Sequence, residues 1–533
     1  MISLGVLFLL GLCCQILQAQ NEWTAPILDA RSPKKIGFGA VGGGSSHYLW
    51  VMEILQELAS RGHVSTLYTR KDSLRFAKDY PNVQTQAIGG DANFLALKKE
   101  SPGVVNPHFK HPNYSPAAGV KLILPALLAN YSNEYNDYMS MIKRNKIDLM
   151  ICDMFAFACI DATTLSKIPL TITSTVAFSE DATTGYVNNI VPSFPIPTTE
   201  YMTIRDRFKY FFHRVYSPYV SRQLQLPTHE FQKQQGLPIS DSIYRSHQDA
   251  FKIVNNMFGL EVPRPLGPLV QMVGPILRKK YDALTPALTT FLDSHRRVAY
   301  VAFGQHAVPT EQDTEFLVHS LVQALKDGHL DGVIWASAPK HPVPVIPRAT
   351  EILVTGWAPQ FAILQHPSTA LFVTHGGAGS VHEALFNKVP LFVFPFFGDQ
   401  PVTARMVRQQ YLGDYIPTAG IQYTKATLEE LTERIRHVLT DPTIKKTVPH
   451  FGDAVQIRSL HAVQRAADII EELTVAAIDG KVLHLSDVGR RISWIKRHNL
   501  DLVGVSVGFA TGLGWFVCKV VRLLKISKKI KTL

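Results

Sequence analysis

The stretch IGFGAVGGGSSH, residues 36–47, decides how the first part of the chain folds. Its glycines Gly37, Gly39 and Gly42 have the spacing G-x-G-x-x-G, which is typical of a dinucleotide-binding turn. That turn requires a complete strand before the first glycine, but here a single residue separates the glycine from a polar run. The predicted strand is therefore IGFGAV itself, with the first two glycines inside it, and the turn follows it.

A helix and a second strand are predicted after this turn. Apolar residues recur at helical spacing through YLWVMEILQELASRGH, and Arg61 and Gly62 end the helix. The next strand, HVSTLYT, is followed by Arg70 rather than by the acidic residue that would bind an NAD ribose. We therefore expect a strand–loop–helix–strand unit that serves a ligand other than NAD. His47 stands where the loop becomes the helix.

The basic charge of the chain is concentrated near its C-terminal end. The formal net charge is +11 at pH 7 over 533 residues, a value that could suit nucleic acid. Residues 490–533 contain ten basic residues and one acidic residue, so +9 of the total lies there and +2 lies elsewhere. A nearly neutral body with a basic tail indicates a membrane surface, and not nucleic acid, as a partner.

Apolar segments occur at both ends of the chain. Residues 2–14 have the length of a signal-peptide core, so we expect residues 1–19 to be a signal peptide; a buried N-terminal strand is the alternative. Residues 499–522 are apolar enough to cross about 30 Å of hydrocarbon as a single transmembrane helix. The basic residues after this helix predict that the tail is cytoplasmic and that the body is lumenal.

Short patterns agree with a lumenal body. Lys529 and Lys531 resemble the dilysine signal K-x-K-x-x of the endoplasmic reticulum, which predicts a single-pass type I protein of that membrane; a basic tail without an address function is the alternative. Asn113 and Asn130 begin N-x-S sequons.

Cys152 and Cys159 are the cysteines outside the predicted signal peptide and membrane helix. They are seven positions apart, across a predicted strand and the helix that follows it. We interpret them as buried apolar side chains rather than as a disulfide.

Two series of alternating strands and helices lie between the ends of the chain. The first runs from residue 36 to about 259 and includes the apolar strand IDLMICD, and the second includes VAYVAFG and ALFVTHGG. A proline-rich join at 261–276 separates them. The predicted fold class is α/β, with two doubly wound Rossmann-like domains that face each other across a cleft at the carboxyl ends of their strands.

The densest group of chemically useful residues lies between Trp357 and Gln400, WAPQFAILQHPSTALFVTHGGAGSVHEALFNKVPLFVFPFFGDQ. The segment HGGAGS follows a predicted strand and opens a helix, so its free N–H groups and the helix dipole suit an anion. A tight turn without a ligand is the alternative for the glycines alone. Side chains that suit a base, a ribose or hydroxyl groups surround this turn: Trp357, Gln360, His375, Ser380, Glu383, Asp399 and Gln400.

This block closely resembles the signature of the UDP-glycosyltransferases, W-x-P-Q … H-P … T-H-G-G … E … D-Q. Weaker similarity extends over most of the chain, for example at ICDMF and FGLEVPRPLGPLVQMVGPI. The resemblance implies a GT-B architecture and a UDP-sugar held mainly by the second domain. The expected boundaries are signal peptide 1–19, N-terminal acceptor-binding domain 20–260, linker 261–280, C-terminal UDP-sugar-binding domain 281–475, juxtamembrane segment 476–498, transmembrane helix 499–522 and cytoplasmic basic tail 523–533.

The resemblance also implies a role for each donor-site residue. Gly379 stands where many members have asparagine, and Gln305 stands where serine is usual. The implied contacts are Trp357 with uracil, Gln360 with the uridine, His375, Gly377, Gly379, Ser380 and Gln305 with the diphosphate, Glu383 with the ribose, and Asp399 and Gln400 with the sugar.

In this family the loop of the first domain carries the catalytic histidine, so the resemblance implies that role for His47. The glycines before it would leave room for an acceptor. An acceptor hydroxyl needs a base in line with the departing UDP, and Asp153 is the matching carboxylate that would hold the imidazole. The alternatives are a helix-start histidine and an N-cap aspartate. A single displacement would invert the anomeric carbon. We expect no metal or other cofactor, because D-x-D is absent from the sequence and the helix start with His375 can neutralise the leaving diphosphate.

The sequence therefore predicts a UDP-glycosyltransferase that transfers a hexosyl group, with glucose favoured, to a small hydrophobic acceptor such as a sterol, a lipid or a xenobiotic. A catalytically silent lumenal UDP-sugar-binding protein and a nucleotide-sugar epimerase of the same fold are the alternatives. Residues 192–220, rich in aromatic and basic side chains, could line the acceptor pocket, lie against the bilayer or form a plain surface helix. Homo-oligomerisation stays open.

Overall fold

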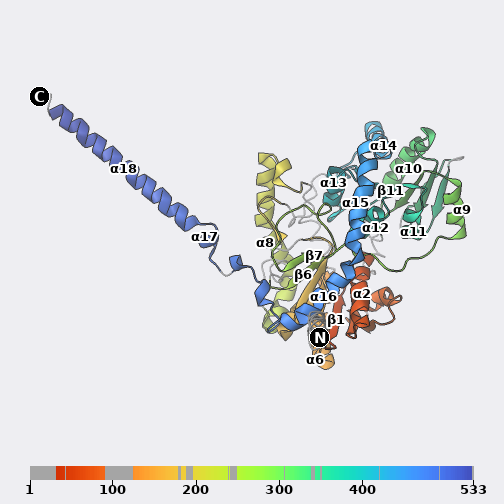
Figure 1. The fold of residues 1–533 in the computed structure, drawn as a ribbon, viewed down its shortest axis with the longest axis horizontal. Coiled ribbons are helices and arrows are strands. Elements are labelled where there is room, and N and C mark those ends of the chain that lie inside the picture. Colours follow the sequence, from red (N-terminus) through yellow and green to blue (C-terminus); the bar gives the residue numbers. More distant parts are fainter. Residues whose placement is uncertain are drawn as a thin grey trace, which may run out of the picture.

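The computed structural model defines a two-domain body and a separate C-terminal helix (Figure 1). The residues that it describes are 32–42, 44–89, 124–125, 127–177, 182–187, 196–237, 239, 249–304, 307–337, 342–347, 351–418, 420–490 and 492–530. The predicted signal peptide, Asn113 and Gln305 lie outside the described residues.

The first domain is built on seven parallel strands in the order β3-β2-β1-β4-β5-β6-β7. Helices cover both faces of this sheet: one apolar core contains α2, and a second core on the other face contains α6 and α7. This arrangement confirms the predicted doubly wound sheet. The strands are β1 (Lys35–Ala40), β2 (Val64–Thr69), β3 (Gln84–Ala87), β4 (Leu149–Asp153), β5 (Leu170–Ser174), β6 (Phe251–Val254) and β7 (Val270–Met272), and the helices are α2 (Ser45–Ser60), α6 (Tyr131–Asn145), α7 (Phe157–Ser166) and α8 (Ile204–Gln234).

The glycines inside β1 allow close packing within this domain. A Cβ atom on Gly37 would overlap Met150, and a Cβ atom on Gly39 would overlap the sulfur of Cys159. The prediction that the glycines of this stretch leave room for an acceptor beside His47 was therefore wrong for Gly37 and Gly39. Their missing side chains make room for the neighbouring strand and helix instead.

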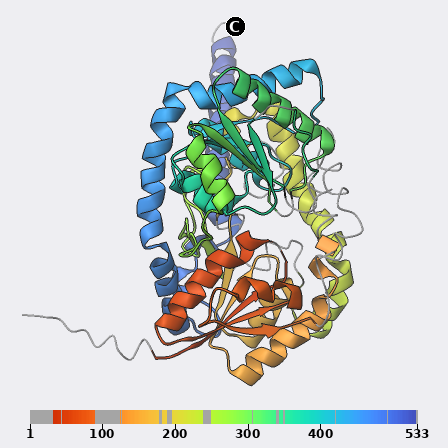
Figure 2. The same cartoon turned by 90° about the vertical axis from the view of Figure 1, so that its right-hand side faces the viewer.

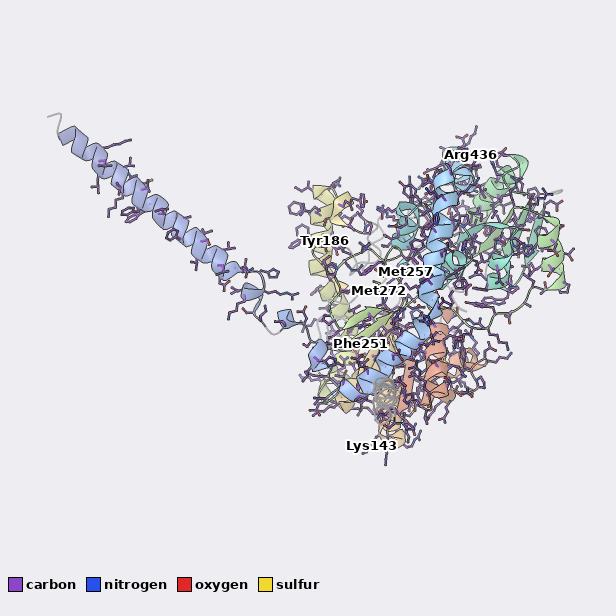
Figure 3. All side chains as sticks on the ribbon, in the orientation of Figure 1. Lys143, Tyr186, Phe251, Met257, Met272 and Arg436 are labelled. Atoms are coloured by element: carbon purple, nitrogen blue, oxygen red, sulfur yellow. A yellow bond between two sulfur atoms is a disulfide. The ribbon has the colours of Figure 1, made fainter. Side chains whose placement is uncertain are left out.

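The second domain is built on six parallel strands in the order β10-β9-β8-β11-β12-β13. One apolar core joins this sheet to its helices and also takes in Met257 and Leu260 from the join after β6 (Figure 3). The strands are β8 (Val298–Ala302), β9 (Gly332–Ala336), β10 (Ile352–Thr355), β11 (Thr369–Thr374), β12 (Leu391–Val393) and β13 (Gly413–Tyr415), and the helices are α9 (Pro286–Ser294), α10 (Glu311–Lys326), α11 (Gln360–Gln365), α12 (Ala378–Phe386), α13 (Gln400–Gln409), α14 (Lys425–Thr440) and α15 (Pro442–Leu460).

The last helix of the body, α16 (Ala462–Ala476), returns to the first domain. Its apolar face belongs to the same core as α2, and Figure 2 shows α15 and α16 in blue running along one side of both domains. Arg61 donates to Glu471 at 2.8 Å, and the ring of His63 is 2.9 Å from the same carboxylate. The predicted C-terminal domain, 281–475, thus includes nearly all of a helix whose apolar face is buried on the first sheet. The predicted linker, 261–280, contains β7 of that sheet.

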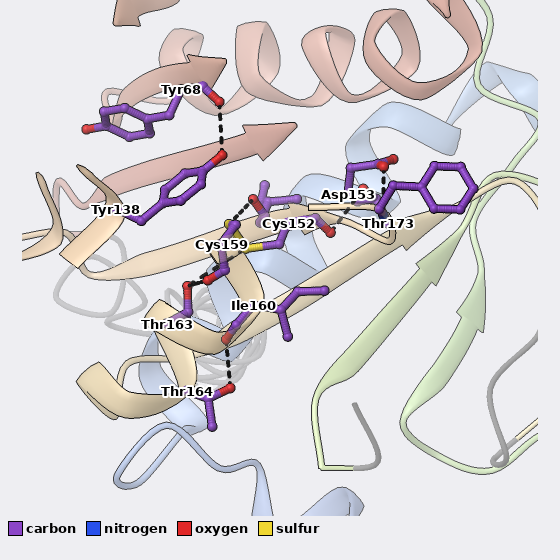
Figure 4. Close-up of a disulfide and its surroundings, with 11 residues drawn as sticks. Tyr68, Tyr138, Cys152, Asp153, Cys159, Ile160, Thr163, Thr164 and Thr173 are labelled. Carbon is purple, nitrogen blue, oxygen red and sulfur yellow. Dashed lines mark hydrogen bonds between the residues drawn. A yellow bond between two sulfur atoms is a disulfide. The ribbon is translucent and has the colours of Figure 1, made fainter. Parts of the chain in front are cut away.

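The two cysteines of the first domain form a disulfide, so their interpretation as unpaired apolar side chains was wrong. The turn between β4 and α7 folds the helix back along the strand and brings the Cα atoms of Cys152 and Cys159 to 5.9 Å (Figure 4). This separation lies in the range that a disulfide needs, about 4.4–6.8 Å. Spacing along the sequence did not reveal the reversal of direction.

The C-terminal helix α18 (Leu500–Ile530) extends away from both domains (Figure 1). Its segment Leu500–Lys525 has a mean hydropathy of 1.6 over its most apolar window, none of which is buried in the body. By length and composition this segment can cross a membrane. The helix continues beyond residue 522, into the segment predicted to be the tail.

A buried histidine lies where the two domains meet. His382 of α12 is 1% exposed, and its Nε2 lies 3.4 Å from Oδ1 of Asn256, which follows β6. Burial lowers the pKa of His382 from 6.5 to about 4. The unfolded chain therefore binds a proton between these pH values that the folded chain excludes, so the free energy of unfolding falls as the pH falls through this range.

We predict an acid-dependent loss of stability that His382 causes. The free energy of unfolding should fall by up to about 1.4 kcal/mol per pH unit below pH 6.5 because of this residue. His382→Gln should flatten the dependence, and the exposed His319→Gln serves as the matched control. Denaturant unfolding between pH 7.5 and 5 measures the slope; an equal slope in all three proteins would contradict the assignment.

Candidate active site

His47 lies in the first turn of α2. The backbone N–H of His47 donates to the carbonyl of Gly44, the N-cap residue, at 3.0 Å. The ring Nδ1 of His47 lies 2.8 Å from Oδ2 of Asp153, and these side chains are 16% and 2% exposed. The structure thus brings together the two residues that the sequence predicted as a pair.

Asp153 is held at the end of β4 by its own turn. Its Oδ1 accepts from the N–H of Phe155 at 3.0 Å, and its carbonyl accepts from the N–H of Ala156 at 2.8 Å. The N-cap of α7 is Ala156, so the alternative that Asp153 caps this helix was wrong. The ring of Phe155 lies 5.1 Å from the ring of His47 and packs against it.

Opposing influences set the basicity of His47. Burial disfavours the charged imidazolium and lowers its pKa, but the charge and hydrogen bond of Asp153, together with the charge of Asp399, raise the pKa above 6.5 overall. The amino end of α2 also disfavours a cation. An imidazole whose Nδ1–H points at a carboxylate exposes Nε2 as a proton acceptor.

Asp399 belongs to the second domain, and its negative charge raises the pKa of His47 in the first domain. Burial raises the pKa of Asp399, while the charge of His47 opposes this rise. Asp399 is the N-cap residue of α13, but its side chain makes no cap hydrogen bond. A hydrogen bond from its own backbone also lowers the pKa of this carboxylate.

The turn between β11 and α12 holds His375 between two glycines. Nδ1 of His375 accepts from the N–H of Gly304 at 3.2 Å, and a Cβ atom on either Gly304 or Gly377 would overlap the ring. A Cβ atom on Gly379 would meet no atom within 4 Å, so the first turn of α12 opens onto unfilled space. An imidazole beside a helix amino end is suited to an anion such as a diphosphate.

Gln360, Ser380 and Glu383 form one hydrogen-bonded group. Nε2 of Gln360 donates to Glu383 Oε2 at 2.7 Å and to Ser380 Oγ at 3.2 Å. Burial raises the pKa of Glu383, against hydrogen bonds from Gln360 and Tyr281 and the charge of Arg278. The ring of Tyr281 also stacks on that of Phe361, with centroids 3.9 Å apart.

Trp357 and Gln400 take different positions at the edge of the site. Trp357 follows β10 and is 71% exposed, so it is not part of the sheet core. Gln400 is buried, and its Oε1 accepts from the N–H groups of Phe396 and Phe397 at 2.8 and 3.1 Å. The oxygen of this amide is therefore hydrogen-bonded to the loop, so Nε2 is the atom suited to donate a hydrogen bond to a sugar hydroxyl.

Sequence reasoning gave no role to Phe155 or Tyr281. Phe155 lies in the segment ICDMF, but a phenylalanine after a strand gives no signal of contact with a distant histidine. Tyr281 lies just after the predicted linker, where composition does not indicate a binding site. In the part of the chain that the structure describes, no group of three or more His, Cys, Asp or Glu side chains could hold a metal ion.

Solved structures of other proteins share this fold. A crystal structure of the glycotransferase of kitacinnamycin is 18% identical, with a TM-score of 0.62 over 83% of this chain and 100% of that chain. A UDP-glucosyltransferase from Polygonum tinctorium, in a complex with 3,4-dichloroaniline, is 18% identical, with a TM-score of 0.56 over 83% and 99% of the two chains. The fold is the GT-B fold of glycosyltransferases.

The family model described as UDP-glucoronosyl and UDP-glucosyl transferase matches residues 41–531, so the chain belongs to this family. Human UDP-glucuronosyltransferase 3A1 is 25% identical over 95% of this chain and 97% of its own length. A UDP-glycosyltransferase of Aspergillus ustus is 26% identical over 86% and 92% of the two chains. The protein is a UDP-glycosyltransferase enzyme, and the alternatives of an epimerase and a silent binding protein find no support among these relatives.

We predict that Gly377 is required for the position of His375. Gly377→Ala places a methyl group on the ring, so it should displace the imidazole and weaken UDP binding at least tenfold. Gly379→Ala adds the same methyl group in the same turn without an overlap and should keep the melting temperature of the wild type. Calorimetric titration with UDP and thermal unfolding test the pair; unchanged UDP affinity in Gly377→Ala would contradict the prediction.

Proposed function

We propose that the enzyme transfers a hexosyl group, with glucose favoured, from a UDP-sugar to a hydroxyl group of a small hydrophobic acceptor, with inversion and without a metal ion. The hydrogen-bonded pair of His47 and Asp153, which interacts with the charge of Asp399 from the other domain, carries this proposal. In this proposal the pair supplies the base that the acceptor hydroxyl needs, from the domain opposite the UDP-sugar.

In the proposed step, Nε2 of His47 takes the proton of the acceptor hydroxyl as the oxygen attacks the anomeric carbon. The bond from that carbon to the diphosphate breaks, and UDP leaves with the electron pair. Nδ1–H of the new imidazolium remains hydrogen-bonded to Asp153, whose negative charge stabilises the cation. A single displacement converts an α-linked donor into a β-glycoside.

The donor is proposed to lie along the second domain. Trp357 would stack on uracil, and Gln360 and Glu383 would hold the uridine and its ribose. His375 and the first turn of α12, with Gly377, Gly379 and Ser380, would stabilise the charge of the leaving diphosphate, which removes the need for a metal ion. Asp399 and Nε2 of Gln400 would hold the sugar.

We further propose that α18 anchors the enzyme in the endoplasmic reticulum membrane as a single-pass type I protein with a lumenal body. A buried disulfide in the first domain supports an oxidising compartment. One face of α8 exposes aromatic side chains, which suits contact with the bilayer and a lipophilic acceptor. These residues are Phe208, Phe211, Phe212, Tyr216 and Tyr219.

His47→Ala should reduce kcat 10²–10⁴-fold, because general-base catalysis is lost, and should leave UDP binding intact. Asp153→Asn should also lose activity and should move the acid limb of the kcat/KM profile to lower pH, because the carboxylate raises the pKa of His47. The double variant should be scarcely worse than His47→Ala alone. Losses that multiply would show that the two residues act independently and would sink the proposed pair.

The membrane orientation makes a separate prediction. Protease added to intact microsomes should remove only the tail, because the membrane protects the lumenal body. Detergent-opened microsomes are the control, in which the body should also be digested. Digestion of the body in intact microsomes would contradict the orientation.

The proposed retrieval signal is tested by the double variant Lys529→Ser/Lys531→Ser. This variant should leave the endoplasmic reticulum, and an unchanged location would contradict the signal.

A further inference from the structure

The disulfide of the first domain lies directly beside the catalytic pair. Cys152 precedes Asp153 in β4, Cys159 lies in the first turn of α7, and both cysteines are 0% exposed. The bond closes a ring across a sequence separation of seven, and Asp153 is one of the residues of this ring (Figure 4). Phe155 belongs to the same ring, because it also lies between the two cysteines in the sequence. The two side chains that contact His47 from this turn are thus both carried by the cross-linked segment.

The size of the ring indicates where the bond acts. A disulfide restricts the unfolded chain less when the loop that it closes is short, so this bond contributes less to global stability than a long-range bond would. Its covalent constraint falls on the turn itself. That turn must keep one carboxylate oxygen on the N–H of Phe155 and the other on the ring of His47.

The sulfur of Cys159 also lies against the strand that leads to His47. Gly39 of β1 is the register partner of Cys152 in β4, and its missing side chain makes room for the sulfur of Cys159. β1 runs directly into the loop that begins α2 and carries His47. The disulfide therefore joins α7 to β4 over Gly39 of β1, and so lies against both strands that lead to the proposed base and its carboxylate.

We propose that the Cys152–Cys159 disulfide is a positioning element for glycosyl transfer, which holds the Asp153 carboxylate and the Phe155 ring against His47. This proposal rests on the proposed function of His47 and Asp153. Without the bond the turn gains conformational freedom, the hydrogen bond to Nδ1 is formed for less of the time, and the imidazolium loses stabilisation. Because both sulfur atoms are buried, a thiolate does not reach them in the folded protein, so the constraint is permanent and not a redox switch.

The test uses the full-length protein in lipid nanodiscs and the double variant Cys152→Ala/Cys159→Ala. With an aliphatic alcohol as acceptor, kcat should fall at least tenfold, the Kd for UDP should stay within twofold, and the acid limb of kcat/KM should move to lower pH. Cys518→Ala, which removes an exposed free cysteine of α18, is the matched control and should leave all three measurements unchanged.

A second acceptor separates positioning from folding. An acidic phenol that is already ionised at the assay pH needs no base, so the double cysteine variant should retain its activity on that acceptor within about threefold. Loss of UDP binding, or an equal loss on both acceptors, would assign the disulfide to domain stability and overturn the proposal. Unchanged kcat and pH profile would overturn it as well.

The same assays distinguish this proposal from the function on which it rests. If His47→Ala loses activity on the alcohol and the double cysteine variant does not, only the positioning role is wrong. If His47→Ala keeps full activity on the alcohol, the general base itself is wrong.

Discussion

The hydrogen bond between His47 and Asp153 is the interaction on which the proposed chemistry depends, and the sheet topology makes it possible. β1 and β4 are neighbours in a parallel sheet, although the residues of the pair are 106 positions apart in sequence. Their carboxyl ends therefore meet at one edge, where the loop after β1 leads into α2 and the turn after β4 leads into α7. The carboxylate offsets both burial and the unfavourable amino end of α2.

The chemistry also requires the two domains to face each other, and several elements fix their relation. The chain crosses from the first domain to the second after β7 and returns in α15 and α16, so two segments of chain join the domains. Arg61 and His63 bind Glu471 of α16. This return keeps the proposed base in the first sheet close enough to the second domain for the charge of Asp399 to raise its pKa.

Local pattern predicted the features that depend on nearby residues. The helical spacing after His47, the apolar parallel strands and the turn at His375 follow from short stretches of sequence. The motif between Trp357 and Gln400 indicated the donor site, and the structure groups Gln360, Ser380 and Glu383 as one hydrogen-bonded unit. Contacts with a ligand remain proposals.

Features that depend on packing between residues far apart in the sequence were not predicted. The apolar stripe of α16 shows that the helix is buried, but it does not show on which sheet. Gly39 and Cys159 are complementary only after α7 has folded back onto β1 and β4, so neither the disulfide nor the true use of the glycine could be read from spacing. The contact between the rings of Phe155 and His47 also depends on this folding of distant segments, so the sequence did not indicate it.

The most direct test of the account is the protonation state of His47 measured by NMR in protein with ¹⁵N-labelled histidine. We expect a pKa above 6.5 that falls in Asp153→Asn and, at a pH above this pKa, a neutral imidazole with the proton on Nδ1 and the lone pair on Nε2. A proton on Nε2, or a pKa that Asp153→Asn leaves unchanged, would contradict the claim that this pair forms the catalytic base.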